Sequence, residues 1–153
     1  MYNITKKLLP LQTKKQSKAH LLETNNSKKN NMKPLNKQFA PKSVMPEKVI
    51  QFGEGNFLRA FVDWIIWNMD QKTDFNGSVV VVQPIERGMV DWLNAQDCLY
   101  HVNLQGRENG KPVNTLERID VISRALNPYS QNAAFMALAD QPEIRFVISN
   151  TTE

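Results

Sequence analysis

The stretch VIQFGEGNFLRAF, residues 49 to 61, decides the fold of this 153-residue chain. It opens with a short β-type run that ends at Gly53 and continues into apolar residues spaced three or four apart, as on one face of a helix. Asn56 is a residue type that favours a helix N-cap, and the predicted helix extends from it to about Met69. A strand that passes through a glycine turn into a helix is the first unit of an α/β fold.

The rest of the body continues this alternation. Val79 to Val82 is apolar and β-branched, which is typical of a parallel strand covered on both faces, and Ile144 to Ile148 predicts a second strand of that kind. The other expected elements are helices over 89–95 and 128–140 and a hairpin of 99–105 with 113–122 around Asn109-Gly110. This order predicts an α/β, Rossmann-like fold with a mainly parallel sheet and an antiparallel hairpin insertion. We expect it to be truncated at the C-terminus, because a helix would normally follow the last strand.

Residues 1 to 45 have a different composition. Ten lysines and two glutamates occur in residues 1 to 47, whereas the remainder has nine basic and thirteen acidic residues. The segment is rich in Lys, Asn, Gln and Ser, so we expect a disordered extension, with a native start possible at Met32. A nucleic-acid or lipid contact by this basic arm is the alternative. We expect neither a nucleic-acid partner nor a membrane span, and the single cysteine, Cys98, favours the cytoplasm.

The glycine turn is the best candidate site. Gly53 permits a tight turn, Gly55 leaves room for a pyrophosphate, and the amides at the helix start face that anion. Arg59, one turn into the helix, is a candidate cationic contact. The third glycine of the usual G-x-G-x-x-G motif is replaced by Leu58, so the spacing by itself leaves an ordinary turn open.

Other candidates follow two of the strands. Gln83 ends the second strand and can bind a ribose hydroxyl without repelling a 2′-phosphate, so it leaves NAD and NADP undecided; Glu86 is the better anionic candidate. Asn150 and Thr151 follow the last strand, where they would line the nicotinamide or ribose, or else cap a helix. His101 is expected to be packed in its strand.

Four stretches carry a family resemblance: PEKVIQFGEGNFLRAFVDW (46–64), GSVVVVQPI (77–85), LNAQDCLYHVNLQG (93–106) and PEIRFVISNTTE (142–153). From about Met32 onward the chain resembles the mannitol dehydrogenase (long-chain polyol dehydrogenase) family, whose turn is of the GxGxFxRA type. Leu58 and Arg59 fit that type, and Cys98 stands where the family's QDGLY stretch has glycine. The resemblance implies an NAD-binding segment made of Ile50, Gln51, Phe52, Gly53, Glu54, Gly55, Asn56, Phe57, Leu58, Arg59, Ala60 and Phe61.

The resemblance also implies a reaction, the reversible reduction of D-tagaturonate to D-altronate by NADH in hexuronate breakdown. The family's catalytic lysine, asparagine and histidine lie in a helical C-terminal domain to which nothing here corresponds. Residues 46–153 are therefore expected to form an incomplete N-terminal NAD-binding domain, inactive alone and possibly served by a separately encoded C-terminal half. A non-catalytic NAD(H)-binding or regulatory module remains the alternative.

Overall fold

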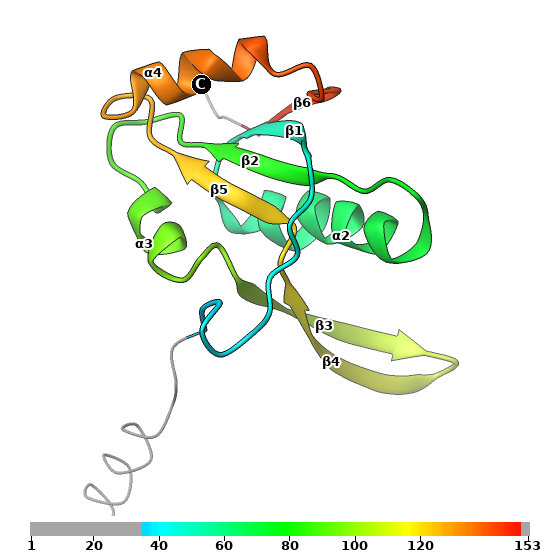
Figure 1. Ribbon diagram of the computed structural model, residues 1–153. Coiled ribbons are helices and arrows are strands. Elements are labelled where there is room, and N and C mark those ends of the chain that lie inside the picture. The colour runs from blue at the N-terminus through cyan, green and yellow to red at the C-terminus, as the bar shows by residue number, and fades with distance from the viewer. Residues whose placement is uncertain (1–34, 151–153) are drawn as a thin grey trace, which may run out of the picture. The chain divides into compact units, whose positions relative to one another are not determined.

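The computed structural model describes residues 35 to 150 (Figure 1). The predictions for residues 1 to 34, including a start at Met32, and for Thr151 lie outside this range. The elements are β1 (Glu47–Phe52), a π-helical segment η1 (Leu58–Val62), α2 (Asp63–Lys72), β2 (Ser78–Val82), α3 (Val90–Ala95), β3 (Tyr100–Glu108), β4 (Lys111–Ile119), β5 (Ile122–Leu126), α4 (Asn132–Met136), a 3-10 segment η2 (Ala137–Asp140) and β6 (Phe146–Ser149).

A parallel sheet of order β5-β2-β1-β6 forms the centre of the fold, and β3 and β4 form a separate antiparallel hairpin. The predicted Rossmann-like architecture is confirmed. Strand β5 is absent from the prediction, which extended the second hairpin strand to Ile122. In the structure β4 ends at Ile119, and β5 pairs with β2. Only Asp120 and Val121 separate the two strands, and no glycine or proline stands between them, so the change of sheet leaves little local signal.

Strand β2 is the most buried element. Val79 to Val82 have no exposed surface. Val79 and Val81 pack on the face covered by α2, α3 and the hairpin, and Val80 and Val82 pack on the face covered by α4 and η2. Figure 1 shows α2 and α4 on opposite faces of the sheet. The prediction of a central strand covered on both faces is confirmed.

The hairpin turn is confirmed as well. Asn109 and Gly110 have φ angles of 50° and 78°, as a two-residue type I′ turn requires at both of its central positions. The hairpin extends away from the parallel sheet in Figure 1. Its base, at Tyr100 and Ile119, is buried in the core of the body.

Residues 35 to 45, expected to belong to the extension, are attached to the body. Lys42 Nζ donates to the carbonyl oxygens of Asp97 and Ser123, each at 2.7 Å. Ser43 Oγ donates to Asp120 Oδ2 at 2.9 Å. The body therefore begins earlier than residue 46. Composition does not reveal these contacts, because a few hydrogen bonds from a polar segment produce no periodic pattern.

Three further features differ from the prediction, namely two helix boundaries and the burial of the last strand. The first helix continues to Lys72 instead of ending near Met69, and α4 begins at Asn132, four residues after Pro128. The last strand is not buried on both faces, since Phe146 and Val147 are 52% and 65% exposed. An apolar run in the sequence predicts a strand whose side chains would be buried. It does not show whether other elements of the protein pack against that strand.

Cys98 occupies a position that favours glycine. Its φ is +57°, in the left-handed region, and its side chain is buried. This conformation gives a physical reason for the glycine that the resemblance led us to expect there, because glycine adopts it without a Cβ clash.

We predict that Cys98→Gly leaves the free energy of unfolding within about 1 kcal/mol of the parent, because relief of roughly 1 kcal/mol of backbone strain offsets a similar loss from the buried thiol. Cys98→Val should cost about 2 kcal/mol or more, because a β-branched residue is poorly tolerated at positive φ. Urea unfolding of the three proteins measures both values. Equal stability of the glycine and valine variants would contradict the account.

Candidate functional site

Gly53 makes the turn at the carboxyl end of β1. Its φ is +115°, and its amide donates to the Val82 carbonyl at 2.9 Å. A Cβ at this position would lie 3.2 Å from Leu58 Cδ1 and 3.6 Å from the Asn150 carbonyl oxygen. The chain itself thus requires glycine here, for conformation and for space.

Gly55 is different, because nothing within the protein requires it. A Cβ at this position would meet no atom within 4 Å, and the residue is exposed. It faces a cavity of about 480 Å³ lined by Gly53, Glu54, Gly55, Pro84, Ile85, Met89 and Asn150. This cavity lies where β1, β2 and β6 end, the edge at which open α/β sheets bind ligands.

The helix begins one residue earlier than predicted. The Arg59 amide donates to the Gly55 carbonyl at 3.3 Å, so Gly55 takes the N-cap position and Asn56 lies inside the helix. The amides of residues 56 to 58 are the first amides of the helix, and such amides have no hydrogen-bond acceptor within the helix. The side-chain oxygen of Asn56 accepts from Arg59 Nη2 at 2.6 Å instead of capping the helix.

Arg59 points inward, whereas the sequence predicts a cationic contact with a ligand. The side chain is 7% exposed, and its Nε donates to the Glu54 carbonyl at 2.9 Å. Its guanidinium lies 5.5 Å from the centre of the Tyr100 ring. Arg59 therefore donates a hydrogen bond to the backbone of Glu54, the middle residue of the turn, and stabilises the conformation of the turn.

A buried polar cluster supports Arg59. Tyr100 Oη donates to the Arg59 carbonyl at 2.9 Å and lies 3.4 Å from Asp63 Oδ2. Gln51 Nε2 donates to the Gly53 carbonyl at 3.1 Å and lies 3.4 Å from the same carboxylate oxygen. Gln51 and Asp63 are fully buried. Sequence reasoning missed Asp63 and Tyr100; a polar residue within the apolar pattern of a helix was the available signal.

Burial raises the pKa of Asp63 to about 7, although hydrogen bonds from Gln51 and Tyr100 and the charge of Arg59 act against the rise. Burial also raises the pKa of Tyr100, and the neighbouring Asp63 carboxylate adds to that rise. Asp63 Oδ1 and Gln51 Oε1 have no hydrogen-bond partner in the structure. A proton on Asp63 turns one unpaired acceptor into a donor, so the neutral acid suits this site.

Gln83 organises the loop after β2. Its Nε2 donates to the carbonyls of Ile85 and Glu86 at 2.8 and 3.0 Å, and its Oε1 accepts from the Val90 amide at 3.2 Å. A Cβ on Gly88 would overlap the side-chain oxygens of Gln83 and Glu54, so a larger residue there would displace the Gln83 amide from its partners. The Gln83 amide already has three backbone partners. The contact of Gln83 with the adenosine ribose stays a prediction. Glu86, the anionic candidate in the same loop, is exposed.

The structure divides the remaining predicted residues into two groups. Asn150 lines the cavity with the turn residues, whereas Ile50, Phe52 and Leu58 contribute to the core and to packing against the turn. Phe57, Ala60 and Phe61 lie on the exposed side of the helix.

His101 is exposed, so the prediction that it is packed is wrong. The residue belongs to β3, in which Tyr100 and Val102 on either side are buried and His101 faces outward. Burial raises the pKa of the Cys98 thiol to about 11, so this thiol is not activated for attack. Within residues 35–150 no group of histidine, cysteine or acidic side chains suits a metal ion, and no helix there is long and apolar enough to cross a membrane.

Residues 47–153 match the family model of the mannitol dehydrogenase Rossmann domain. The chain belongs to the mannitol dehydrogenase family. It is 77% identical over 122 residues to an altronate oxidoreductase of Phocaeicola vulgatus and 76% identical to that of Bacteroides thetaiotaomicron. Each alignment covers 80% of this chain and 26% of the relative, so the chain spans about a quarter of the length of these curated relatives.

Solved structures show the same fold. The mannitol 2-dehydrogenase of Pseudomonas fluorescens, in a ternary complex with NAD and D-mannitol, has a TM-score of 0.61 and 23% identity. The match covers 76% of this chain and 26% of that one. A D-sorbitol dehydrogenase in substrate-free form has a TM-score of 0.60 and 23% identity, with 74% of this chain and 24% of that one covered. The fold of the mannitol dehydrogenase Rossmann domain is therefore shared.

The Asp63 carboxyl makes stability depend on pH. The folded protein holds this proton with a pKa of about 7, compared with an ordinary value of 3.8. The stabilisation is complete below the ordinary pKa and is lost as pH rises through about 7, at about 1.4 kcal/mol for each unit of pKa difference.

We predict that Asp63→Asn removes most of this pH dependence and makes the protein more stable than the parent at alkaline pH. Asparagine keeps an oxygen for Gln51 and Tyr100 and never ionises. Urea unfolding on both sides of neutral pH measures the difference. A parent and variant with parallel pH profiles would show that Asp63 does not carry this proton.

Proposed function

We propose that this chain forms the NAD-binding part of an oxidoreductase that reduces D-tagaturonate to D-altronate with NADH. One observation carries the proposal: the exposed Gly55 leaves the space above the turn open at the carboxyl edge of a parallel sheet. A side chain at residue 55 would meet nothing in the protein. The free space is explained if a ligand approaches the backbone there.

The cavity suits the parts of a dinucleotide. The pyrophosphate would lie over Gly55 and accept hydrogen bonds from the leading amides of the helix, where the helix dipole also favours an anion. The adenosine ribose would lie beside Pro84 to Glu86, and the nicotinamide side of the cofactor beside Asn150 and Thr151. When bound, the cofactor supplies the hydride. The chain's own residues bind and orient it.

The names of the relatives support the proposed substrate class. The Phocaeicola vulgatus and Bacteroides thetaiotaomicron proteins are both named altronate oxidoreductase, and the Pseudomonas fluorescens structure is a complex with NAD and D-mannitol. We therefore assign this chain to cytoplasmic hexuronate catabolism. The groups that act on the substrate would come from polypeptide that corresponds to the unmatched part of the relatives, so residues 1–153 bind the cofactor without turning over substrate.

A calorimetric titration with NADH tests the proposal, and we predict saturable binding of one NADH per chain. Gly55→Val should weaken this binding at least tenfold, about 1.4 kcal/mol, because the new side chain fills the pyrophosphate space. Gly106→Val is the matched control: a Cβ at Gly106, on the hairpin, also meets nothing within 4 Å. The control should bind like the parent. Absence of NADH binding by the folded parent chain would refute the proposed function.

Arg59 should matter to binding without touching the cofactor. We predict that Arg59→Lys and Arg59→Met weaken NADH binding to a similar degree, because neither side chain has the guanidinium fork that bonds the Glu54 carbonyl and Asn56. Binding of NADH at low and high salt should show the same salt dependence in all three proteins. A lysine variant that restores affinity would instead indicate a charge contact with the phosphates.

A further inference from the structure

Glu54, the middle residue of the glycine turn, is a nearly buried acid in the cofactor cavity. It lies between two glycines, yet only 8% of its surface is exposed. It lines the cavity of about 480 Å³ at the carboxyl edge of the sheet, together with Pro84, Ile85 and Met89 from beyond β2. A buried acid is costly unless it finds partners, so the contacts of Glu54 indicate what it does.

Two hydrogen bonds fix the direction of Glu54. Its carbonyl accepts from Arg59 Nε at 2.9 Å, and its side-chain oxygen Oε1 accepts from the Met89 amide at 3.3 Å. The carboxylate therefore reaches to the loop that joins β2 to α3, whereas the pyrophosphate would lie over Gly55. A Cβ on Gly88 would lie 2.1 Å from Glu54 Oε1, so the carboxylate packs against the backbone of that loop.

The second carboxylate oxygen, Glu54 Oε2, is available to a ligand. It takes part in no hydrogen bond or ion pair within residues 35–150. It is also not one of the buried side-chain atoms that lack a partner, so it keeps access to open space. A carboxylate oxygen accepts hydrogen bonds and cannot donate them. Oε2 therefore suits a hydroxyl group and repels a phosphate.

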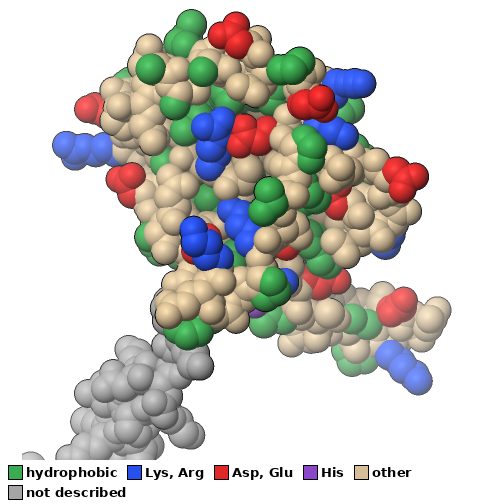
Figure 2. All heavy atoms as spheres, in the orientation of Figure 1, with side chains coloured by type: hydrophobic (Ala, Val, Ile, Leu, Met, Phe, Trp, Pro, Cys, Tyr) green, Lys and Arg blue, Asp and Glu red, His purple; other side chains and the backbone are tan. Residues whose placement is uncertain are grey.

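More distant charges do not supply such a choice on the face of the molecule that Figure 2 shows. Basic and acidic side chains are interspersed there over the described residues. Only a surface dominated by one sign attracts or repels an anion strongly at long range. On this face, discrimination between ligands that differ by one phosphate falls to groups that lie close to that phosphate.

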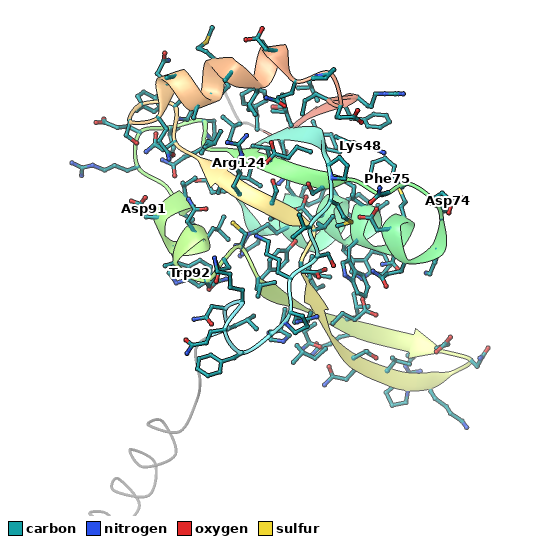
Figure 3. All side chains as sticks on the ribbon, in the orientation of Figure 1. Lys48, Asp74, Phe75, Asp91, Trp92 and Arg124 are labelled. Carbon is teal, nitrogen blue, oxygen red and sulfur yellow. The ribbon has the colours of Figure 1, made fainter. Side chains whose placement is uncertain are left out.

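Three acidic residues belong to the turn or to the segment after β2, and of these Glu54 alone lines the cavity. Glu86 is exposed in the loop, and Asp91, which Figure 3 labels on α3 beside Trp92, is exposed as well. In many dinucleotide-binding sheets an acid after the second strand binds the adenosine ribose. Here Gln83 ends that strand and spends its side chain on three backbone groups of the loop.

We infer that Glu54 selects NADH over NADPH: its free carboxylate oxygen accepts a hydrogen bond from the adenosine ribose and repels a 2′-phosphate. This role rests on the proposed function, which places the ribose beside the loop after β2. The acid comes from the turn in place of the second strand. Because the Met89 amide anchors one oxygen of the carboxylate, the other is held in position before the ligand arrives.

Calorimetric titrations of the chain with NADH and with NADPH test this role, and the ratio of the two dissociation constants is the measured quantity. We expect the parent to bind NADH at least about tenfold more tightly than NADPH. Glu54→Gln should bring the two constants to within about threefold of each other. Glutamine keeps an oxygen for the Met89 amide, loses the charge and gains an N–H that a phosphate can accept.

Asp91→Asn is the matched control, because it removes one negative charge from an exposed side chain that does not line the cavity. Its ratio should stay within about twofold of the parent ratio, since exposed distant charges are screened. Glu54→Asp keeps the charge and should still bind NADH more tightly than NADPH. Urea unfolding confirms that each variant is folded.

A change in the ligand provides a measurement that needs no variant. NADH whose adenosine ribose lacks the 2′-hydroxyl should bind the parent at least about threefold more weakly than NADH, because the free oxygen of Glu54 loses its donor. The same change should make little difference to Glu54→Gln, whose amide group is not charged.

Four outcomes overturn the role of Glu54. They are a parent that binds NADPH as tightly as NADH, a parent that binds the 2′-deoxy ligand as tightly as NADH, an unchanged ratio in Glu54→Gln, and a ratio that narrows in Glu86→Gln instead. A folded parent that binds neither dinucleotide refutes the proposed function as well. NADH binding with an unchanged ratio in Glu54→Gln refutes the role of Glu54 alone.

Discussion

The complete burial of β2 is the constraint on which the rest of the structure depends. Four consecutive valines without exposed surface require apolar cover on both faces of the sheet. The helices α2 and α3 and the hairpin base supply it on one face, and α4 with η2 supplies it on the other. Because β1 and β2 are parallel, their carboxyl ends meet at one edge. The glycine turn and the loop after β2 are therefore neighbours, although thirty residues separate Gly53 from Gln83.

The turn is held by polar groups that lie beneath it. Arg59 bonds the Glu54 carbonyl, Gln51 bonds the Gly53 carbonyl, and Tyr100 bonds the Arg59 carbonyl. Tyr100 belongs to β3, so the hairpin insertion contributes directly to the support of the turn. Unpaired polar groups in a buried network are costly, and a proton on Asp63 turns one of its unpaired acceptors into a donor, so the protonation of Asp63 is part of the structure of the site.

The incomplete cover of β6 leaves apolar side chains exposed. Each parallel strand needs a neighbour and a covering helix, and within residues 35–150 β6 has one strand neighbour. Phe146 and Val147 of this strand are large apolar side chains with exposed surface. Four apolar residues of the first helix are exposed as well: Phe57, Phe61, Ile65 and Met69. Trp64 and Trp67 are half-buried on α2, beside the core. Both pack against it, and their indole N–H groups donate to Glu117 and Asp120.

The sequence by itself determined the α/β class, the central strand, the hairpin turn and the position of the glycine turn. These features depend on local properties: the period of apolar residues, β-branching, and the conformational freedom of glycine. The fit of Leu58 and Arg59 to a family pattern also needed no structure.

Only the tertiary structure decided which residues face the cavity and which hold the turn. Arg59 and Gln51 lie in the motif, but their side chains point into the body because carbonyls of the turn and Tyr100, which is distant in sequence, meet them there. Gln83 turns toward its own loop for the same reason. The switch of the chain from β4 to β5 and the exposure of β6 likewise depend on contacts between distant segments. The sequence shows which side chains are apolar and which of them share one face of a helix or strand. Three-dimensional packing decides whether another part of the protein covers that face.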